Sequence, residues 1–267
     1  MSTSELEQIV STKNQHVQQV RELLTKKSAR EKTGQFIVEG VRLSEEALNS
    51  GIVPIKVFYS ETLSPRGLEL VQKASASGSS VLFVTSNVMD ALSETETAQG
   101  LIMVVQNLPK QLPDNLDFII VVDQLRDPGN LGTVLRTAVA ASAQAVLITP
   151  GSVDPYSPKV VRAAMGAHFS VPIISSSWAK ILSLCKNRRL PLRIMLAESE
   201  RGTPLWQVDL KQPIAIVIGG EAEGVSEEVR ADADTLINIP MPGGSESLNA
   251  AVAASIILFE VVRQRSS

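Results

Sequence analysis

The sequence predicts an α/β protein with two units, a smaller N-terminal α/β unit followed by a C-terminal unit built on a mostly parallel sheet. Short apolar runs alternate with helical patterns along all 267 residues, as in α/β layers. The apolar runs of the second half are rich in Val and Ile without polar alternation, which is typical of strands buried on both faces of a parallel sheet. A proline-containing stretch separates the two halves.

The first half opens with a polar helical pattern from Thr12 to Arg30, in which Val17, Val20 and Leu23 form an apolar stripe. Short apolar runs and further helical patterns follow it. Strands are expected at 36–38, 54–59, 81–85 and 101–105, and helices at 41–49, 67–76 and 86–91.

The boundary between the halves is expected at 107–115. Pro109 and Pro113 remove backbone donors and disfavour helix at the residues before them. The sequence therefore predicts a first domain over 1–108, a linker over 109–115 and a second domain over 116–267.

The second half repeats the alternation more strongly. Strands are expected at 118–122, 145–148, 193–197, 215–218 and 236–239, and helices at 131–141, 158–164, 178–185, 226–231 and 247–263. Ligands of open parallel sheets bind beyond the carboxyl ends of the strands. The loops after Val122, Ile218 and Ile239 are therefore the candidate site.

In the first of these loops, Pro128 and Gly129 indicate a turn, and Asn130 is the expected N-cap of the next helix. Arg136 follows within two turns and is expected to point towards the strand ends. Taken alone, the pattern favours a capped helix with one solvated arginine.

In the second loop, a buried strand ends in Gly219 and Gly220, followed by Glu221. Paired glycines allow a positive φ and a close approach of the backbone to a ligand. The dinucleotide fingerprint GxGxxG is absent. A plain glycine-rich turn into a helix is the alternative interpretation.

In the third loop, a strand ending at Ile239 runs through Gly243 and Gly244 into a long helix, with Ser247 and Asn249 near its first turn. Free amides at a helix start favour an anion, although Ser245 or Ser247 would also serve as a simple cap. An apolar stripe on this helix indicates core or a dimer seam. It consists of Leu248, Val252, Ile256, Phe259 and Val262.

Together, 130–136, 219–224 and 239–249 resemble the three motifs of the SpoU/TrmH family of RNA 2′-O-ribose methyltransferases. The resemblance extends from Leu116 to Arg265. The opening segments 9–14, 26–30 and 34–40 resemble the L30e-like RNA-binding domain of the ribosomal-RNA members. Ser142 and Ala164 depart from the pattern, since many members have Gly and Ser there.

The resemblance implies a C-terminal domain with a trefoil knot that binds S-adenosylmethionine, and homodimers formed through this domain. It implies donor contacts from Gly219, Ile239 and Leu248. It places Asn130, Arg136, Glu221, Ser247 and Asn249 at the catalytic and RNA-facing positions.

The reaction needs a ribose hydroxyl aligned with the donor methyl and a group that accepts or offsets the hydroxyl proton. The family's proposed proton acceptor is Arg136. Because a guanidinium is normally protonated at neutral pH, binding of a phosphate and stabilisation of the developing alkoxide is an equal alternative.

RNA contacts must come from local charge, because 25 Lys+Arg and 28 Asp+Glu leave a net charge of −3. The segment from Lys13 to Lys32 contains six basic and two acidic residues. We expect Lys13, Lys26, Lys27 and Arg30 to contact RNA phosphates. A second basic cluster, Lys186, Arg188, Arg189 and Arg193, is the alternative. Aromatic residues are only 4%, which favours recognition of RNA shape and backbone over base stacking.

One cysteine, Cys185, and two distant histidines argue against disulfides and metal sites. The polar start predicts no signal peptide and a cytoplasmic protein. The resemblance makes a 2′-O-methyltransferase of large-subunit ribosomal RNA the leading prediction. A tRNA ribose methyltransferase and a non-catalytic RNA-binding or ribosome-assembly protein of the same fold remain alternatives. A nucleotide-dependent oxidoreductase is disfavoured by the missing GxGxxG.

Overall fold

The structure is a computed structural model that describes residues 8–95, 98–107, 111–220 and 224–266. Its contacts divide the chain into two compact units, 1–108 with 156–169, and 109–155 with 170–267. Both are α/β layers, so the predicted α/β class, with a parallel sheet in the second half and a smaller α/β unit before it, is confirmed.

The described part of the first unit contains a four-stranded sheet of order β1-β4-β2-β3, in which only β2 and β3 are parallel. The strands are β1 (Gln35–Glu39), β2 (Lys56–Tyr59), β3 (Ser80–Phe83) and β4 (Leu101–Gln106). The helices are α1 (Gln15–Thr25), α2 (Lys27–Thr33), α3 (Val41–Asn49), α4 (Pro65–Ala76), α5 (Ser86–Leu92) and α7 (Pro158–Ala164), with a 3-10 turn at Ala167–Phe169.

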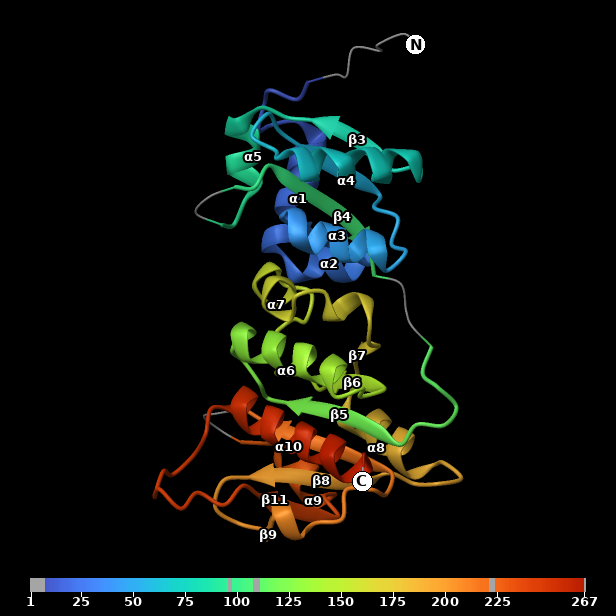
Figure 1. The fold of residues 1–267 in the computed structure, drawn as a ribbon, viewed down its shortest axis with the longest axis vertical. Helices are drawn as coiled ribbons and strands as arrows, with labels where there is room; N and C mark the ends of the chain where they lie inside the picture. Colours follow the sequence, from blue (N-terminus) through green and yellow to red (C-terminus); the bar gives the residue numbers. More distant parts are fainter. Residues whose placement is uncertain (1–7, 96–97, 108–110, 221–223, 267) are drawn as a thin grey trace. The chain divides into compact units, whose positions relative to one another are not determined.

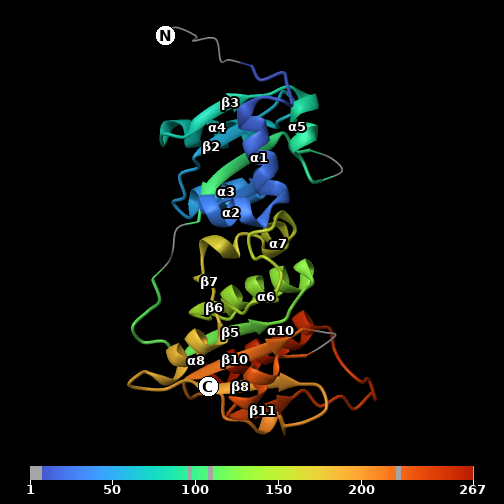
Figure 2. The same cartoon turned by 180° about the vertical axis from the view of Figure 1, so that it is seen from behind.

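Alternation along the strands gives this sheet two apolar faces. Phe36 and Val38 point into a cluster with α3, α4 and α7, whereas Ile37 points into a cluster with α1 and α5. Figure 2 shows α1 crossing the sheet on that second face.

The helix expected over 12–30 is two helices, since Lys26 has extended backbone angles of φ −112° and ψ 115°. Arg30 closes the break. Its guanidinium is buried and donates to the carbonyl oxygens of Leu23, at 2.5 Å, and Leu24, at 3.2 Å. These carbonyls at the end of α1 would otherwise lack partners.

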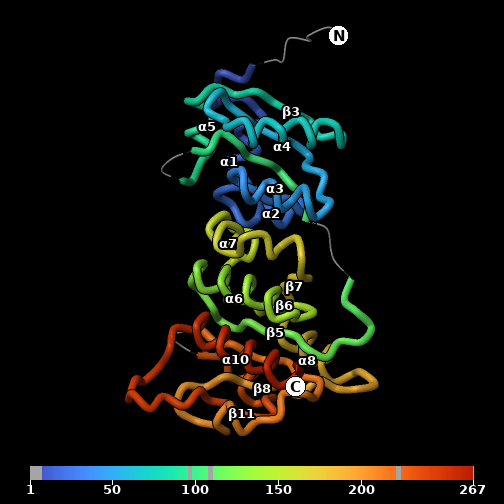
Figure 3. Tube along the Cα trace, viewed as in Figure 1, coloured from blue at the N-terminus to red at the C-terminus, as the bar shows by residue number. Residues whose placement is uncertain are grey.

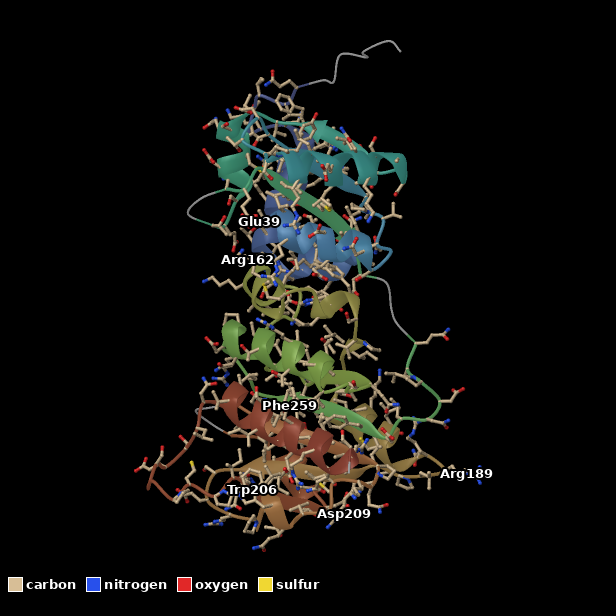
Figure 4. The ribbon with its side chains drawn as sticks, viewed as in Figure 1. Glu39, Arg162, Arg189, Trp206, Asp209 and Phe259 are labelled. Atoms are coloured by element: carbon tan, nitrogen blue, oxygen red, sulfur yellow. The ribbon has the colours of Figure 1, made fainter. Side chains whose placement is uncertain are left out.

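The segment Tyr156–Phe169 packs within the first unit, although it comes from the second half of the sequence. The ring of Phe36 lies 5.1 Å from that of Tyr156 and 6.4 Å from that of Phe169, measured between centroids. Arg162 lies 3.4 Å from the Glu39 carboxylate (Figure 4). Residues beyond the predicted boundary thus complete the core of the first unit.

The second unit contains a seven-stranded parallel sheet of order β7-β6-β5-β10-β8-β11-β9 in its described part (Figure 1). The strands are β5 (Phe118–Asp123), β6 (Ala145–Ile148), β7 (Ile173–Ser175), β8 (Arg193–Glu198), β9 (Thr203–Pro204), β10 (Ile214–Gly219) and β11 (Thr235–Asn238). The helices are α6 (Pro128–Ala140), α8 (Trp178–Lys186), α9 (Glu227–Ala231) and α10 (Ala250–Arg265), with a 3-10 turn at Leu205–Gln207.

Helices cover both faces of this sheet. Ile119 and Val121 of β5 pack with Trp178 of α8 and Val229 of α9. On the other face, α10 lies alongside α6, and the Thr137 and Ser255 hydroxyls are 3.1 Å apart (Figure 1). Burial on both faces accounts for the continuous apolar strand sequences.

The apolar stripe predicted on the last helix is not its core face. The buried side chains of α10 include Ala254, Ile257 and Leu258, while Val252 and Phe259 are 48% and 50% exposed. Figure 4 labels Phe259 on this helix. Neighbouring apolar residues all round this helix made the sequence pattern ambiguous.

Candidate active site

A cavity of about 420 Å³ opens at the carboxyl ends of β8, β10 and β11 and at the start of α10. Apolar side chains form much of its wall, including Ile237, Ile239, Leu248 and Ala253. Strand-end residues lie around it because all the strands of this sheet run in one direction. The loops after Ile218 and Ile239, which the sequence singled out, both line this cavity.

The two residues that flank the loop after β10 are hydrogen-bonded to each other beside the cavity. The Gly220 amide donates to the Gly224 carbonyl at 3.0 Å, and the Gly224 amide donates back at 3.1 Å. The positive φ expected at Gly219 and Gly220 is wrong, because in this loop the positive value is 68° at Gly224. Gly220 is needed for another reason: a Cβ there would lie 2.1 Å from the carbonyl oxygen of Gln124.

A buried carboxylate ties this loop to the neighbouring strands. Asp123, at the end of β5 and 1% exposed, pairs in register with Gly219. It accepts a hydrogen bond from the Thr149 hydroxyl and one of 2.7 Å from the Ser226 amide. Asp123 thus joins the ends of β5 and β6 to the start of α9, a role that no sequence motif had indicated.

A long connection joins β11 to α10 (Figure 3). Four of its residues line the cavity: Ile239, Ser247, Leu248 and Asn249. Asn249 caps α10, accepting from the Ala251 amide at 3.0 Å. The expectation that Ser245 or Ser247 caps this helix is wrong, because the helix begins after both of them.

The first motif reaches the same site through Asn130, whose Oδ1 accepts from the Asn249 Nδ2 at 2.9 Å. Asn130 is not the N-cap of α6. Asp127 holds that place and accepts from the Asn130 amide at 2.7 Å. Asp127 and Asn130 both favour the N-cap position, so the sequence could not choose between them, and Pro128 is suited to the first helical position after Asp127.

Arg136 lies on the exposed side of α6, and it is not among the residues that line the cavity in the described part of the chain. Glu221 lies outside the described residues. The catalytic roles of these two residues stay predictions.

Glu198 was not identified from the sequence. It ends β8, lines the cavity, and forms an ion pair of 2.6 Å with Arg230 of α9. The signal was present, since a carboxylate at the carboxyl end of a strand is well placed for a ligand.

The basic residues of the first unit differ in their surroundings. Lys13, Lys26 and Lys27 are exposed, and the latter two form ion pairs with Glu22 and Glu31 at 2.9 and 3.6 Å. Arg30 is buried at the end of α1. Its hydrogen bonds to the carbonyl oxygens of Leu23 and Leu24 stabilise the end of α1, so the predicted contact of this side chain with RNA phosphates is not supported.

The second basic cluster lies at the other end of the sheet from the cavity, because Arg193 begins β8, whose last residue lines the cavity, and Arg188 and Arg189 precede it. Figure 4 labels Arg189. Lys186 is paired with Asp234 at 2.7 Å.

The described residues contain no candidate metal centre, because no three His, Cys, Asp or Glu side chains lie close enough together to hold a metal ion. None of the described helices has the length and apolar character to traverse a bilayer.

Comparison with known proteins identifies both parts of the chain. Residues 117–259 match the SpoU rRNA Methylase family, and residues 14–103 match the MRM3-like substrate binding domain. The 23S rRNA (guanosine(2553)-2′-O)-methyltransferase RlmP of Bacillus subtilis is 33% identical over 257 residues, which cover 96% of this chain and 99% of that protein.

Solved structures give the same result. AviRb, a SpoU methyltransferase from Streptomyces viridochromogenes in complex with the cofactor AdoMet, has a TM-score of 0.87 at 30% identity, covering 95% of this chain and 99% of its own. An AdoMet-bound rRNA methyltransferase from Sinorhizobium meliloti has a TM-score of 0.84 at 29% identity, covering 96% and 97%. The predicted resemblance is confirmed, and the chain belongs to the SpoU rRNA methylase family.

Proposed function

We propose that this protein transfers a methyl group from S-adenosylmethionine to the 2′-hydroxyl of a ribose in ribosomal RNA, with the large-subunit, 23S-type RNA as its substrate. One observation carries the proposal. The second and third motif loops line one cavity, and the first motif is hydrogen-bonded to it through Asn130 and Asn249. The relatives that share this arrangement of sequence are named as 23S rRNA 2′-O-methyltransferases.

The cavity fits the donor. Its volume of about 420 Å³ is in the range of small-molecule sites, which are mostly apolar with a few polar groups. Ile237, Ile239 and Leu248 offer apolar contacts, and Gly219 and Gly220 present backbone without side chains. S-adenosylmethionine, when bound, supplies a methyl group activated by a positively charged sulfur.

The side chains of the protein then position the RNA hydroxyl and offset its developing charge. We assign Arg136 to the target phosphate and the alkoxide, because a guanidinium gives two parallel donors and is a poor base. The Asn130–Asn249 hydrogen bond holds the start of α6 against the third loop. Ser247 orders that loop, and Glu221 orients Arg136.

The test is methyl transfer from radiolabelled donor to 23S ribosomal RNA and to tRNA, with donor binding followed by calorimetry. Arg136→Ala is expected to reduce turnover by a factor of at least about 10² and to leave donor affinity unchanged, because Arg136 does not line the cavity. Arg201→Ala, a change at an exposed arginine outside both basic clusters, is the matched control. Unchanged turnover in Arg136→Ala would remove it from the mechanism, and methylation of tRNA alone would favour the alternative substrate.

We also propose that the first domain, 1–108, binds RNA through Lys13, Lys26 and Lys27. Deletion of this domain is a poor test, because it would strip Tyr156–Phe169 of its packing partners. Replacement of the three lysines by Glu in the full chain should weaken RNA binding and reduce its salt dependence, with no loss of donor affinity. Equal loss of both affinities would contradict this division of roles.

We place the protein in the cytoplasm, where ribosomal RNA is found.

We also propose that the protein forms a homodimer through its second domain. Val252 and Phe259 stand exposed one above the other on α10, and an exposed apolar stripe of this kind favours a protein contact. Light scattering should give a dimer that Phe259→Arg converts to a monomer. Leu190→Arg, a substitution at a 66% exposed position, should stay dimeric. A monomeric wild-type protein would refute the dimer.

A further inference from the structure

The cavity wall contains one ionisable side chain among the described residues, and it is Glu198. Its carboxylate lies at the end of β8, and the side chain is 17% exposed. The rest of the described wall is apolar, glycine backbone or neutral polar groups such as Ser199, Ser247 and Asn249. A charge in such surroundings interacts strongly with whatever binds there.

Arg230 fixes this carboxylate. Its Nη1 lies 2.6 Å from the Glu198 Oε1, and a Cβ placed at Gly224 would lie 3.7 Å from its Nη2. The guanidinium therefore lies beside Gly224, between α9 and the end of β8. A carboxylate has about four acceptor positions on its two oxygens. The ion pair uses Oε1, so Oε2 keeps its capacity to accept further hydrogen bonds.

We propose that Glu198 accepts hydrogen bonds from the ribose hydroxyls of the methyl donor and that Arg230 is the positioning residue that holds it; this inference rests on the proposed function. Acidic side chains at strand ends recognise ribose hydroxyls in dinucleotide-binding folds by the same chemistry. The two ribose hydroxyls are neutral, so they can donate hydrogen bonds to the Glu198 carboxylate without adding a charge to the cavity.

The donor also carries an ammonium group, which a carboxylate could bind instead. Arg230 argues against that choice. Its guanidinium already offsets the charge of Glu198 at 2.6 Å, and a second cation would meet a like charge at the same carboxylate. The ion pair thus favours a neutral hydrogen-bond donor over a cationic one.

The proposal is tested by calorimetric binding of three probes to the full-length protein. S-adenosylmethionine and S-adenosylhomocysteine carry both the diol and the ammonium, whereas 5′-methylthioadenosine carries only the diol. Glu198→Ala should weaken all three probes by a similar factor of about 10 to 100, the range for a hydrogen bond to a charged group. The affinity of Glu198→Gln for each probe should lie between those of Glu198→Ala and the wild type. Glu200→Gln, a change at an exposed residue of the same loop, is the matched control and should bind as wild type does.

Two comparisons make the assignment specific. 2′-Deoxy-5′-methylthioadenosine should bind more weakly than its parent to the wild type but nearly as well as its parent to Glu198→Ala, because the lost hydroxyl no longer has a partner. Arg230→Met should weaken the binding of 5′-methylthioadenosine when it is the only substitution. In the double variant with Glu198→Ala it should have little further effect on that affinity. Melting temperatures measured without ligand identify any variant that fails to fold.

The outcomes separate the two levels of the argument. If the wild type binds neither S-adenosylmethionine nor S-adenosylhomocysteine, the proposed function fails. If the wild type binds them and Glu198→Ala loses affinity only for the probes with an ammonium, or for none, the ribose assignment is overturned while the proposed function stands.

Discussion

Replacement of Gly220 by Ala tests how the second motif loop is held. A Cβ at this position would lie 2.1 Å from the Gln124 carbonyl oxygen and 2.9 Å from its carbon, both of which are backbone atoms. Ordinary contacts begin at about 3.4 Å, so the two backbones must separate. Gln124 has little freedom to move, since it already adopts a left-handed φ of 56° and follows the anchored Asp123.

Forcing such a group into a packed site typically costs about 1–3 kcal/mol. We expect Gly220→Ala to lower the free energy of unfolding by about this amount. We also expect weaker binding of S-adenosylmethionine, because Gly220 and its bridge partner Gly224 both line the cavity. Urea denaturation measures the first effect and calorimetry the second.

Gly243→Ala is the matched control in the third motif loop. A Cβ there has no atom within 4 Å, and the residue has no positive φ. Its effect on unfolding should stay within about 0.5 kcal/mol. If the two alanine variants have the same stability and the same donor affinity, the close approach of Gly220 to Gln124 does not fix this loop.

Three further substitutions probe groups outside the cavity wall. Asp123→Ala should lower the free energy of unfolding by about 1–3 kcal/mol, because it leaves the partly buried Ser226 amide without its acceptor; urea denaturation that shows no loss would contradict the anchoring role. Burial raises the pKa of Asp234, but hydrogen bonds from Lys186 and the Ile194 amide and the nearby positive charges bring it below its ordinary value of 3.8. Its contribution to stability is therefore present above about pH 4 and is lost as the pH falls through the lowered pKa. The denaturation midpoints of wild type and Asp234→Asn should therefore differ by a constant amount above about pH 4 and approach each other as the pH falls below it, and a gap that stays constant in acid would refute this. Ser142 has a φ of 58°, so Ser142→Gly should raise the melting temperature by relieving strain of about 1 kcal/mol, whereas a lower melting temperature would show that the strain is absent.

The sequence predicted most of the secondary structure of both units. The runs at 145–148 and 158–164 became β6 and α7 with the expected bounds, since strand and helix periods are local properties of the chain. β7 and β9 were missed. They are the edge strands, three and two residues long, too short to give a period.

The sequence was less informative about the site. The motif loops were found because glycines, prolines and polar residues gathered at strand ends. The cap of α6 was assigned to Asn130 instead of Asp127 because both favour that place, and local pattern could not choose between them. The Glu198–Arg230 pair joins residues far apart in sequence, and no local rule links them.

The sequence by itself determined most of the helices and strands, the strand-end loops that meet at the cavity, and the family to which the chain belongs, because these follow from order and spacing along the chain. Only the tertiary structure decided that Arg30 is buried under α1, that Tyr156–Phe169 completes the first unit, and that Asp123 and Glu198 support the cavity. The last two depend on contacts between residues distant in sequence, which form only when the strands are paired in register, whereas Arg30 bonds to residues six and seven positions away across a helix break that the local pattern did not predict.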